Sequence, residues 1–414
     1  MLFLAVIIAS FVNSKIRSGI RGRKKIIQNI QNNLPPLESK CQRIWIHVSS
    51  YGEFLQVKPV LNHLKRVKPN LFIIISFFSP SGYDHINIEP LIDFKCYLPF
   101  DTYFQAKKFI SIISPQLAVI VRHDIWPNFA WRLNYENIPL VLIDASLPQN
   151  SSRFLPGLRA LNKVLFSCME AILAISEDEK EKFSQLVDDP EKITVIGDTK
   201  YDQVFERSQN LDRISQLLAE PKLREKKILV VGSSWQTDED YLIPAFQQLL
   251  QKFNDLVMIL APHEPQSHRI DEIENRLKQA YLNSARLSEL KPGEFDSHCL
   301  IIDRVGVLAN IYYLGNIAFV GGSFHYKIHN VLEPAIYGIP VIFGPKINTS
   351  SEALYLLKQD AAILVNSTQE IVDVVKNLVE NPEQAEQYGN RAKQLVMQNV
   401  GNSEKIAQFL LQYL

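Results

Sequence analysis

Short runs of apolar residues, many of them β-branched, alternate with longer amphipathic stretches along almost the whole chain. The runs are nearly continuous, as in "RIWIHVS" (43–49), and are not interrupted by polar residues at every second position. Strands that are apolar on both faces belong to parallel sheets covered by helices on both sides. The pattern therefore predicts an α/β fold of the doubly wound kind.

The number of these runs predicts two sheets, because thirteen strands are too many for one open sheet of this kind. The expected strands are 43–49, 71–78, 95–100, 117–121, 139–145, 171–176 and 193–197, then 227–234, 255–262, 299–303, 317–323, 340–344 and 361–365. A polar stretch between residues 202 and 227 separates the seven from the six. We therefore expect two Rossmann-like domains that face each other across a cleft.

The expected organisation has six parts, divided where the composition of the chain changes. They are an apolar membrane-associating segment (1–14), a basic collar and linker (15–40), an N-terminal Rossmann-like domain (41–203), an inter-domain linker (204–225), a C-terminal Rossmann-like domain (226–382) and a C-terminal helix (383–414). We expect the C-terminal helix to pack back on the junction of the two domains. No short-period repeat or low-complexity segment occurs in the sequence.

The first twelve residues carry no charge, whereas six Lys and Arg residues lie between positions 15 and 25. The apolar part is shorter than the roughly 20 residues of a membrane span. It also precedes the charges, which is the reverse of a secretory signal. An apolar segment followed by cations favours insertion into a membrane with an anionic near face. The alternative is a buried N-terminal helix with a solvated basic end.

Composition and charge exclude several classes of protein. Hydrophobic residues make up 46% and charged residues 21%, which is typical of a globular chain. Lys and Arg number 44, as do Asp and Glu, so the zero net charge argues against a nucleic-acid partner. The four cysteines are scattered, without a CxxC pair, which favours a reducing compartment and no zinc site. No histidine or carboxylate group has the spacing of metal ligands.

Four polar clusters follow predicted strands, and ligands bind at the carboxyl ends of parallel strands. The first is "SSYGE", in which Gly52 allows a tight turn and Glu53 begins an apolar helix. An ionised Glu53 could act as a general base, and the helix dipole would keep it ionised unless burial opposes that effect. The alternative is that Ser50 and Glu53 only cap the helix.

The second cluster, "VRHDIWPN", places Arg122, His123 and Asp124 after a buried strand. Its alternative is an exposed polar loop with His123 in water. The third cluster, "GDTKYD", contains Lys200, a cation that could steady a phosphate or a developing negative charge.

The fourth cluster is "FVGGSFHYKIHNVLEPAIYGIPVIFGP" (319–345). Gly321 and Gly322 let the backbone approach a ligand, and the helix that follows presents N–H groups to a phosphate. Glu333 near the start of that helix could accept hydrogen bonds from two ribose hydroxyls.

Together these clusters resemble the patterns of the 3-deoxy-D-manno-octulosonic acid (Kdo) transferase family of lipopolysaccharide synthesis. "HVSSYGE" is similar to the family's "HxVSVGE", "GDTKYD" to its "GNLKFD" and "DRVGVL" to its "DTxGEL". The fourth cluster resembles "VGGSLVPRGGHNPLEPAALGKPVLFGPH". The resemblance covers nearly the whole chain and implies the two-domain glycosyltransferase fold known as GT-B.

The resemblance also implies an activity: inverting transfer of Kdo from CMP-Kdo to a lipid A precursor, lipid IVA, at the cytoplasmic face of the inner membrane. No metal or other cofactor is implied. Glu53 would be the general base and Lys200 the transition-state stabiliser, joined by Arg122 and Asp124. Ser50 and Gly52 would lie on the acceptor side. The residues implied for donor binding are Pro262, His263, Arg304, Val305, Gly306, Gly322, Ser323, His329, Asn330, Val331, Leu332 and Glu333.

The chain departs from the family pattern at three of these positions. Arg122 and Asp124 stand where the family has glutamates, and Pro262 stands where it has an arginine beside the donor phosphate. Two alternatives therefore remain: another GT-B enzyme, such as a nucleotide-sugar 2-epimerase, or a non-catalytic membrane-bound GT-B scaffold. The apolar N-terminus counts against an epimerase, because such enzymes are soluble.

Overall fold

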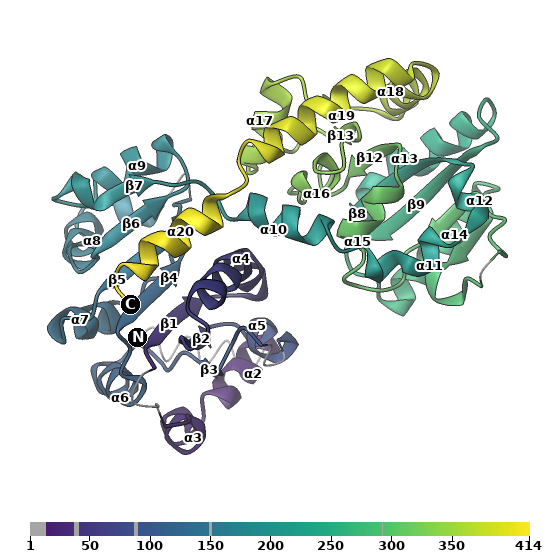
Figure 1. Ribbon diagram of the computed structural model, residues 1–414. Coiled ribbons are helices and arrows are strands. Elements are labelled where there is room, and N and C mark those ends of the chain that lie inside the picture. The colour runs from purple at the N-terminus through teal and green to yellow at the C-terminus, as the bar shows by residue number, and fades with distance from the viewer. Residues whose placement is uncertain (1–13, 37–40, 87–89, 149–150, 292) are drawn as a thin grey trace. The chain divides into compact units, whose positions relative to one another are not determined.

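The computed structural model describes residues 14–36, 41–86, 90–148, 151–291 and 293–414 (Figure 1). The chain divides into two compact units. The first contains the chain up to Gln203 together with Asn399–Leu414, and the second contains Val204–Gln398. The predicted apolar N-terminal segment lies outside the described residues, except for its last residue, Ser14. Within the described parts of the chain, no helix is both long and apolar enough to span a membrane.

The first unit is built on a parallel sheet of seven strands in the order β3-β2-β1-β4-β5-β6-β7. The strands are β1 (Arg43–Val48), β2 (Phe72–Phe77), β3 (Phe94–Tyr97), β4 (Leu117–Val121), β5 (Leu140–Ala145), β6 (Ala171–Ala174) and β7 (Ile193–Val195). The direction of strand succession reverses between β1 and β4. The carboxyl ends of these two strands are therefore where a ligand is expected.

Helices cover both faces of this sheet (Figure 1). They are α2 (Ser14–Gly22), α3 (Ile26–Asn33), α4 (Tyr51–Val67), α5 (Pro80–His85), α6 (Tyr103–Ile113), α7 (Pro127–Tyr135), α8 (Leu158–Ser167), α9 (Glu177–Ser184) and α20 (Asn402–Leu411), with short 3-10 turns at Ser152–Phe154 and Pro190–Lys192. Alternate residues of β1 enter two cores. Trp45 packs with α6 and α7, whereas Ile44 and Ile46 pack with α4 and α20.

The second unit has its own seven-stranded parallel sheet, in the order β10-β11-β9-β8-β12-β13-β14. Its strands are β8 (Lys227–Ser234), β9 (Leu256–Pro262), β10 (Ser284–Arg286), β11 (Cys299–Ile301), β12 (Ile317–Val320), β13 (Val341–Phe343) and β14 (Ile363–Leu364). Here the order reverses between β8 and β12. The expected fold class, two doubly wound α/β sheets, is confirmed.

Helices also flank the second sheet, and α10 (Lys200–Ser208) leads into this unit. They are α11 (Ser215–Leu218), α12 (Pro221–Arg224), α13 (Gln236–Leu250), α14 (Ser267–Gln279), α15 (Leu308–Ile311), α16 (Leu332–Ala335), α17 (Ser351–Lys358), α18 (Thr368–Glu380) and α19 (Pro382–Met397), with 3-10 turns at Asp212–Ile214, Leu287–Glu289 and Tyr312–Leu314.

Three segments differ from the sequence-based expectation. The range 204–225, expected as a linker, forms short helices whose apolar residues, such as Leu217, are buried against the second sheet. Instead of one C-terminal helix there are two, α19 and α20, separated at Gly401, whose φ is 105°. The expected collar is partly structural, because Ile26 and Ile30 of α3 are buried in the first unit.

Candidate active site

The turn after β1 places Glu53 at the carboxyl end of the first sheet. Ser50 caps α4, and its Oγ accepts the Glu53 N–H at 3.5 Å. The Glu53 carboxylate in turn accepts the Ser49 N–H at 2.5 Å. Gly52 lies in the first turn of α4, where a Cβ would meet nothing nearer than Ser50 Oγ at 3.8 Å. A larger residue would therefore also fit at this position.

Glu53 is held in surroundings that favour its protonated form. Burial raises the pKa of Glu53 and outweighs the hydrogen bond from Ser49, which lowers it. The charge of Asp124 raises it further. Burial thus opposes the helix dipole, and the pKa moves toward the range in which a carboxylate can accept a proton during a reaction.

A buried histidine orients Asp124. His47 lies on β1, is 1% exposed, and its Nε2 is 3.1 Å from Asp124 Oδ2. Its Nδ1 lies 2.9 Å from Ser76 Oγ on β2. Burial alone would raise the pKa of Asp124, but the hydrogen bond and charge of His47, together with smaller contacts, lower it below the usual value. His47 is the first residue of the "HVSSYGE" motif. Because it lies within an apolar strand, the sequence did not indicate that it would contact Asp124.

Arg122 ties three elements together at the same end of the sheet. It adopts a left-handed backbone, with φ 65°. Its guanidinium donates to Gln56 Oε1 of α4 at 2.8 Å and to Ser146 Oγ after β5 at 3.3 Å, and it lies 3.5 Å from Asp198 Oδ2. The first three predicted clusters are thus brought together, with Arg122 as a structural cation among them.

The "GDTKYD" cluster also seats the C-terminal helix. Asp202 accepts the backbone N–H groups of Gly401 at 2.9 Å and Ser403 at 3.3 Å, at the start of α20. A Cβ on Gly197 would lie 2.3 Å from Asn402 Nδ2, so this position excludes any larger residue. Lys200 begins α10 and is half-buried, and its backbone N–H donates to Asp198. Gly197 and Asp202 of this motif therefore have structural roles.

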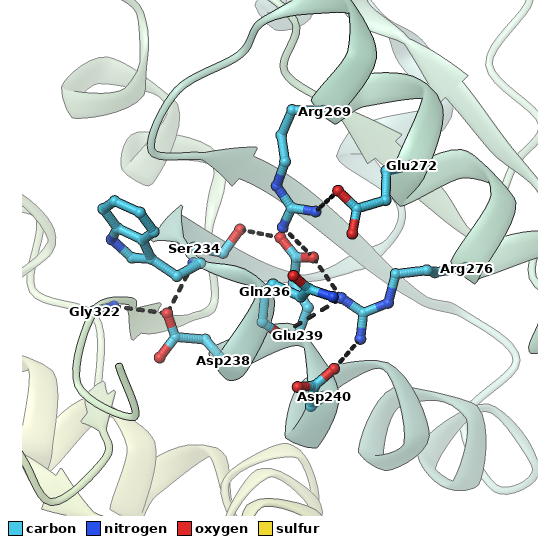
Figure 2. A network of polar contacts seen from close by, with 10 residues as sticks. Ser234, Gln236, Asp238, Glu239, Asp240, Arg269, Glu272, Arg276 and Gly322 are labelled. Atoms are coloured by element: carbon cyan, nitrogen blue, oxygen red, sulfur yellow. Dashed lines mark hydrogen bonds and ion pairs between the residues drawn. The ribbon is translucent and has the colours of Figure 1, made fainter. Parts of the chain in front are cut away.

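In the second unit, Asp238 organises the Gly-Gly turn that follows β12. Its carboxylate accepts the N–H groups of Gly322 at 2.7 Å and Trp235 at 2.9 Å (Figure 2). It also accepts the Phe324 N–H at 3.0 Å. Gly322 has φ 83°, and a Cβ there would lie 2.2 Å from the Lys327 carbonyl oxygen. Only glycine fits, but its N–H is already bound by Asp238.

The neighbouring carboxylate, Glu239, is fully buried between two arginines (Figure 2). It accepts from Ser234 Oγ at 2.9 Å and from Arg276 at 3.0 Å, and Arg269 donates to it as well. Arg269 also pairs with Glu272 at 3.0 Å, and Arg276 pairs with Asp240. The two arginines therefore fasten α14 to the start of α13 and are neutralised by carboxylates.

Four rings meet at the carboxyl ends of β8, β9 and β12. His263 and His329 are two predicted donor residues that are far apart in the sequence. The centroids of their rings are 4.3 Å apart. Trp235 stacks on His263 at 4.9 Å and on His325 at 4.6 Å. Trp235 Nε1 donates to His329 Nε2 at 3.1 Å. His325 lies in the fourth predicted cluster but was not among the predicted donor residues. Trp235 was not predicted, because nothing in the sequence places it beside these histidines.

Two further predicted donor residues, Gly306 and Glu333, contact an arginine of α10. Arg207 lies 3.5 Å from Glu333 and donates to the Gly306 carbonyl oxygen at 3.2 Å. Burial raises the pKa of Glu333, while Arg207 and a hydrogen bond from Asn330 lower it, and the net shift is upward. Arg207 was not predicted, although it joins the "DRVGVL" and "HNVLEP" stretches.

The side chains of the other predicted donor residues have varied surroundings. Ser323 Oγ donates to the Val320 carbonyl and accepts the Gly344 N–H, so it is engaged within the fold. Val331 and Leu332 are buried, as is Pro262 at the end of β9. Arg304 donates to the Leu287 carbonyl, and Val305 is 79% exposed. Asn330 Oδ1 accepts the Leu332 N–H.

Among the residues that the structure describes, no group of three or more His, Cys, Asp or Glu side chains could hold a metal ion. The polar residues where the strand order of each sheet reverses are carboxylates, imidazoles and guanidiniums, many of them paired with one another. They can bind and orient an anionic ligand and can move a proton.

The two doubly wound sheets define a class of fold, the GT-B-like fold. The UDP-GlcNAc 2-epimerase from Neisseria meningitidis, solved bound to UDP-GlcNAc, has a similar fold, with a TM-score of 0.63, 16% identity, and coverage of 90% of this chain and 100% of that one. A glycosyltransferase from Rickettsia africae is also similar, with a TM-score of 0.59, 12% identity, and coverage of 90% and 98%. At these identities the likeness concerns the fold alone.

Sequence comparison identifies the family. Residues 20–203 match the family described as 3-deoxy-D-manno-octulosonic-acid transferase (kdotransferase). The transferase of this name from Chlamydophila psittaci is 30% identical over 351 residues, which cover 83% of this chain and 79% of the relative. The one from Haemophilus influenzae is 28% identical over 377 residues, which cover 90% and 87%. The chain belongs to the Kdo transferase family and is a glycosyltransferase of lipopolysaccharide biosynthesis.

Proposed function

We propose that this glycosyltransferase moves Kdo from CMP-Kdo to lipid IVA, a lipid A precursor, with inversion at the anomeric carbon and without a metal ion. The observation that carries the proposal is the position of Glu53. It is a half-buried carboxylate with a raised pKa at the point where the strand order of the first sheet reverses. The nearby Asp124 has a pKa that the hydrogen bond from His47 lowers, which keeps it ionised.

The proposed reaction is a single displacement. Glu53 removes the proton from an acceptor hydroxyl as the hydroxyl oxygen forms a bond to the anomeric carbon of Kdo. The bond between that carbon and the phosphate oxygen breaks, and its electron pair leaves with CMP. The charge of Asp124 makes Glu53 a stronger base, because a second carboxylate nearby disfavours the ionised form. We assign to Lys200 the stabilisation of negative charge on the leaving phosphate.

Donor binding is proposed for the second unit. Glu333 is a half-buried acceptor that lies 3.5 Å from Arg207, and it would accept hydrogen bonds from the ribose hydroxyls of CMP. His263 and His329 lie together at the ends of the strands and would face the phosphate. Arg269 and Arg276 are committed to Glu239, so they do not replace the arginine that the family has at the position of Pro262.

The test replaces Glu53 by glutamine and follows CMP release from CMP-Kdo in the presence of lipid IVA. We expect Glu53→Gln to lower kcat by a hundredfold or more, a typical effect of losing a general base. CMP affinity, measured by calorimetry, should stay unchanged. Near-normal turnover would remove Glu53 from this role.

The chain offers a matched control for that variant. Glu370 caps α18 in the same way, since its N–H donates to Ser367 Oγ and its carboxylate accepts the Asn366 N–H. Glu370 is exposed, whereas Glu53 is half-buried. Glu370→Gln therefore makes the same change in a comparable capping carboxylate without touching the site. If both variants lose activity equally, capping and not catalysis explains the effect.

The same assay separates the two alternatives. Interconversion of UDP-GlcNAc and its 2-epimer, without CMP release, would favour an epimerase. CMP-Kdo binding without any release of CMP in the presence of lipid IVA would favour a non-catalytic scaffold.

We further propose that the enzyme acts at the cytoplasmic face of the inner membrane, where its N-terminus contacts the lipid surface. Four cations of the predicted basic collar, Arg17, Arg21, Lys24 and Lys25, are exposed. Arg23 is different, because it is buried and donates to the Leu98 carbonyl at 2.8 Å. Exposed cations next to an apolar segment support attraction to anionic lipid.

A further inference from the structure

The indole N–H of Trp235 is committed to a histidine that we assign to donor binding. Trp235 begins the turn after β8, and its Nε1 lies 3.1 Å from Nε2 of His329. Two imidazoles, those of His263 and His325, stack on the same indole with interplanar angles of 27° and 15°. The ring is therefore fixed in place, and its N–H has a fixed direction.

This hydrogen bond determines the protonation of His329. An indole N–H can only donate, so Nε2 of His329 must accept and carries no proton. A neutral imidazole has one proton, which then resides on Nδ1, whereas an imidazolium has no acceptor nitrogen at all. The surroundings agree: burial, and then the neighbouring His263 and Lys327, lower the pKa of His329 to about 4.

The other nitrogen of His329 is left as a donor. In the described part of the chain, no residue accepts a hydrogen bond from Nδ1 of His329. The backbone N–H of His329 is bound to the Gly321 carbonyl at 3.1 Å, which holds the residue against the Gly-Gly turn. His329 therefore offers one N–H of defined identity at the carboxyl end of β12.

We propose that Trp235 is a positioning residue for donor binding: it holds His329 as the neutral Nδ1–H tautomer, and this N–H binds an anionic oxygen of the nucleotide-linked sugar. The identity of the ligand rests on the proposed function. The assignment of the His329 tautomer does not rest on the proposed function, because it follows from contacts within the chain.

The experiment uses the full chain labelled with ¹⁵N-histidine. Long-range ¹H–¹⁵N spectra distinguish the two tautomers and the imidazolium, and the His329→Asn variant identifies the His329 signals. Trp235→Phe keeps an aromatic ring in the stack and removes only the N–H. Trp131→Phe, at a 39% exposed tryptophan of α7, is the matched control. CMP affinity of each variant is measured by calorimetry.

We expect wild-type His329 to carry its proton on Nδ1 between about pH 6 and pH 8, since this range lies above its lowered pKa. In Trp235→Phe the Nε2–H form should become populated, and the dissociation constant for CMP should rise about tenfold, the effect of one lost hydrogen bond to a charged group. Trp131→Phe should change neither quantity.

Wild-type His329 that is protonated on Nε2, or on both nitrogens, near pH 7 would overturn the proposal even if Trp235→Phe does not fold. An unchanged tautomer and an unchanged CMP affinity in Trp235→Phe would also overturn it. A wild-type chain that has the Nδ1–H tautomer but binds no CMP would contradict the proposed donor, while the positioning of His329 by Trp235 would stand.

Discussion

Glu53 combines a capping role with a place at the carboxyl end of the first sheet, and the two are compatible. The cap fixes the carboxylate against the Ser49 N–H, while burial and the charge of Asp124 raise its pKa. Transfer should therefore slow as the pH falls through this raised pKa, because the protonated acid cannot accept the acceptor's proton.

Replacing Asp124 by asparagine tests the coupling between the two carboxylates. Loss of the Asp124 charge should lower the pKa of Glu53, so the acidic limb of the profile of kcat/KM against pH should move to lower pH. Asp188→Asn, at an exposed carboxylate of the same unit, should leave the limb in place. A limb that stays or moves to higher pH in Asp124→Asn would contradict the coupling.

His329 should make the protein less stable in acid. Its pKa is lowered from 6.5 to about 4 in the folded chain, first by burial. As the pH falls from about 6.5 toward 4, the unfolded chain binds a proton that the folded chain does not, so the free energy of unfolding decreases. His329→Asn should flatten this decrease in urea titrations at pH 7 and pH 5. An equally steep decrease in the variant would exclude His329 as its source.

The sequence predicted functional residues that lie in a recognisable motif. It did not predict residues whose role depends on a partner that is distant in the sequence. Glu53 and His329 stand out beside strand ends. Trp235 does not, because its partner His329 is 94 positions away. Asp238 and Arg207 were missed for the same reason: their roles depend on Gly322 and Glu333, which only the folded chain brings near.

At the scale of elements, all thirteen predicted strands are present, because burial on both faces leaves an unbroken apolar run. The missed strand, β10, is a half-buried edge strand with the sequence Ser-Ala-Arg, which has no such run. The division of the C-terminal region was also missed. Gly401 is one glycine among many in the sequence, and its positive φ is a property of the folded chain.

Asp202 tests how α20 is held on the first unit. Asp202→Ala removes a carboxylate that caps the N-terminus of α20, so the free energy of unfolding should fall by about 1–2 kcal/mol. The change is measured by urea denaturation at pH 7. Asp188→Ala, in an exposed ion pair, is the control and should cost less than about 1 kcal/mol. Equal losses in the two variants would argue against the cap.

At the scale of the whole molecule, the two units repeat one architecture. Each has its own cores and its own point at which the strand order reverses. This architecture does not by itself separate a transferase from an epimerase, since the similar epimerase fold has a TM-score of 0.63. The motifs separate them, and the sequence relatives agree with the motifs.

The exposed cations near the N-terminus give a prediction for the full chain. Changing Arg21, Lys24 and Lys25 together to glutamate should weaken binding to vesicles that contain phosphatidylglycerol, because each cation near an anionic surface contributes about 1 kcal/mol. Vesicle sedimentation measures the effect. Glutamate at Lys107 and Lys108, two exposed positions of α6, is the control and should have a smaller effect. Unchanged binding in the triple variant would remove these cations from membrane contact.

The most direct test of the central claim is the mass of the lipid formed when the wild-type chain and Glu53→Gln are each incubated with CMP-Kdo and lipid IVA. We expect a lipid product larger by Kdo with the wild type, and at most about a hundredth of that amount with Glu53→Gln, whose CMP binding is retained. Equal product from both proteins, or no Kdo-bearing lipid from a wild type that binds CMP, would contradict the central claim.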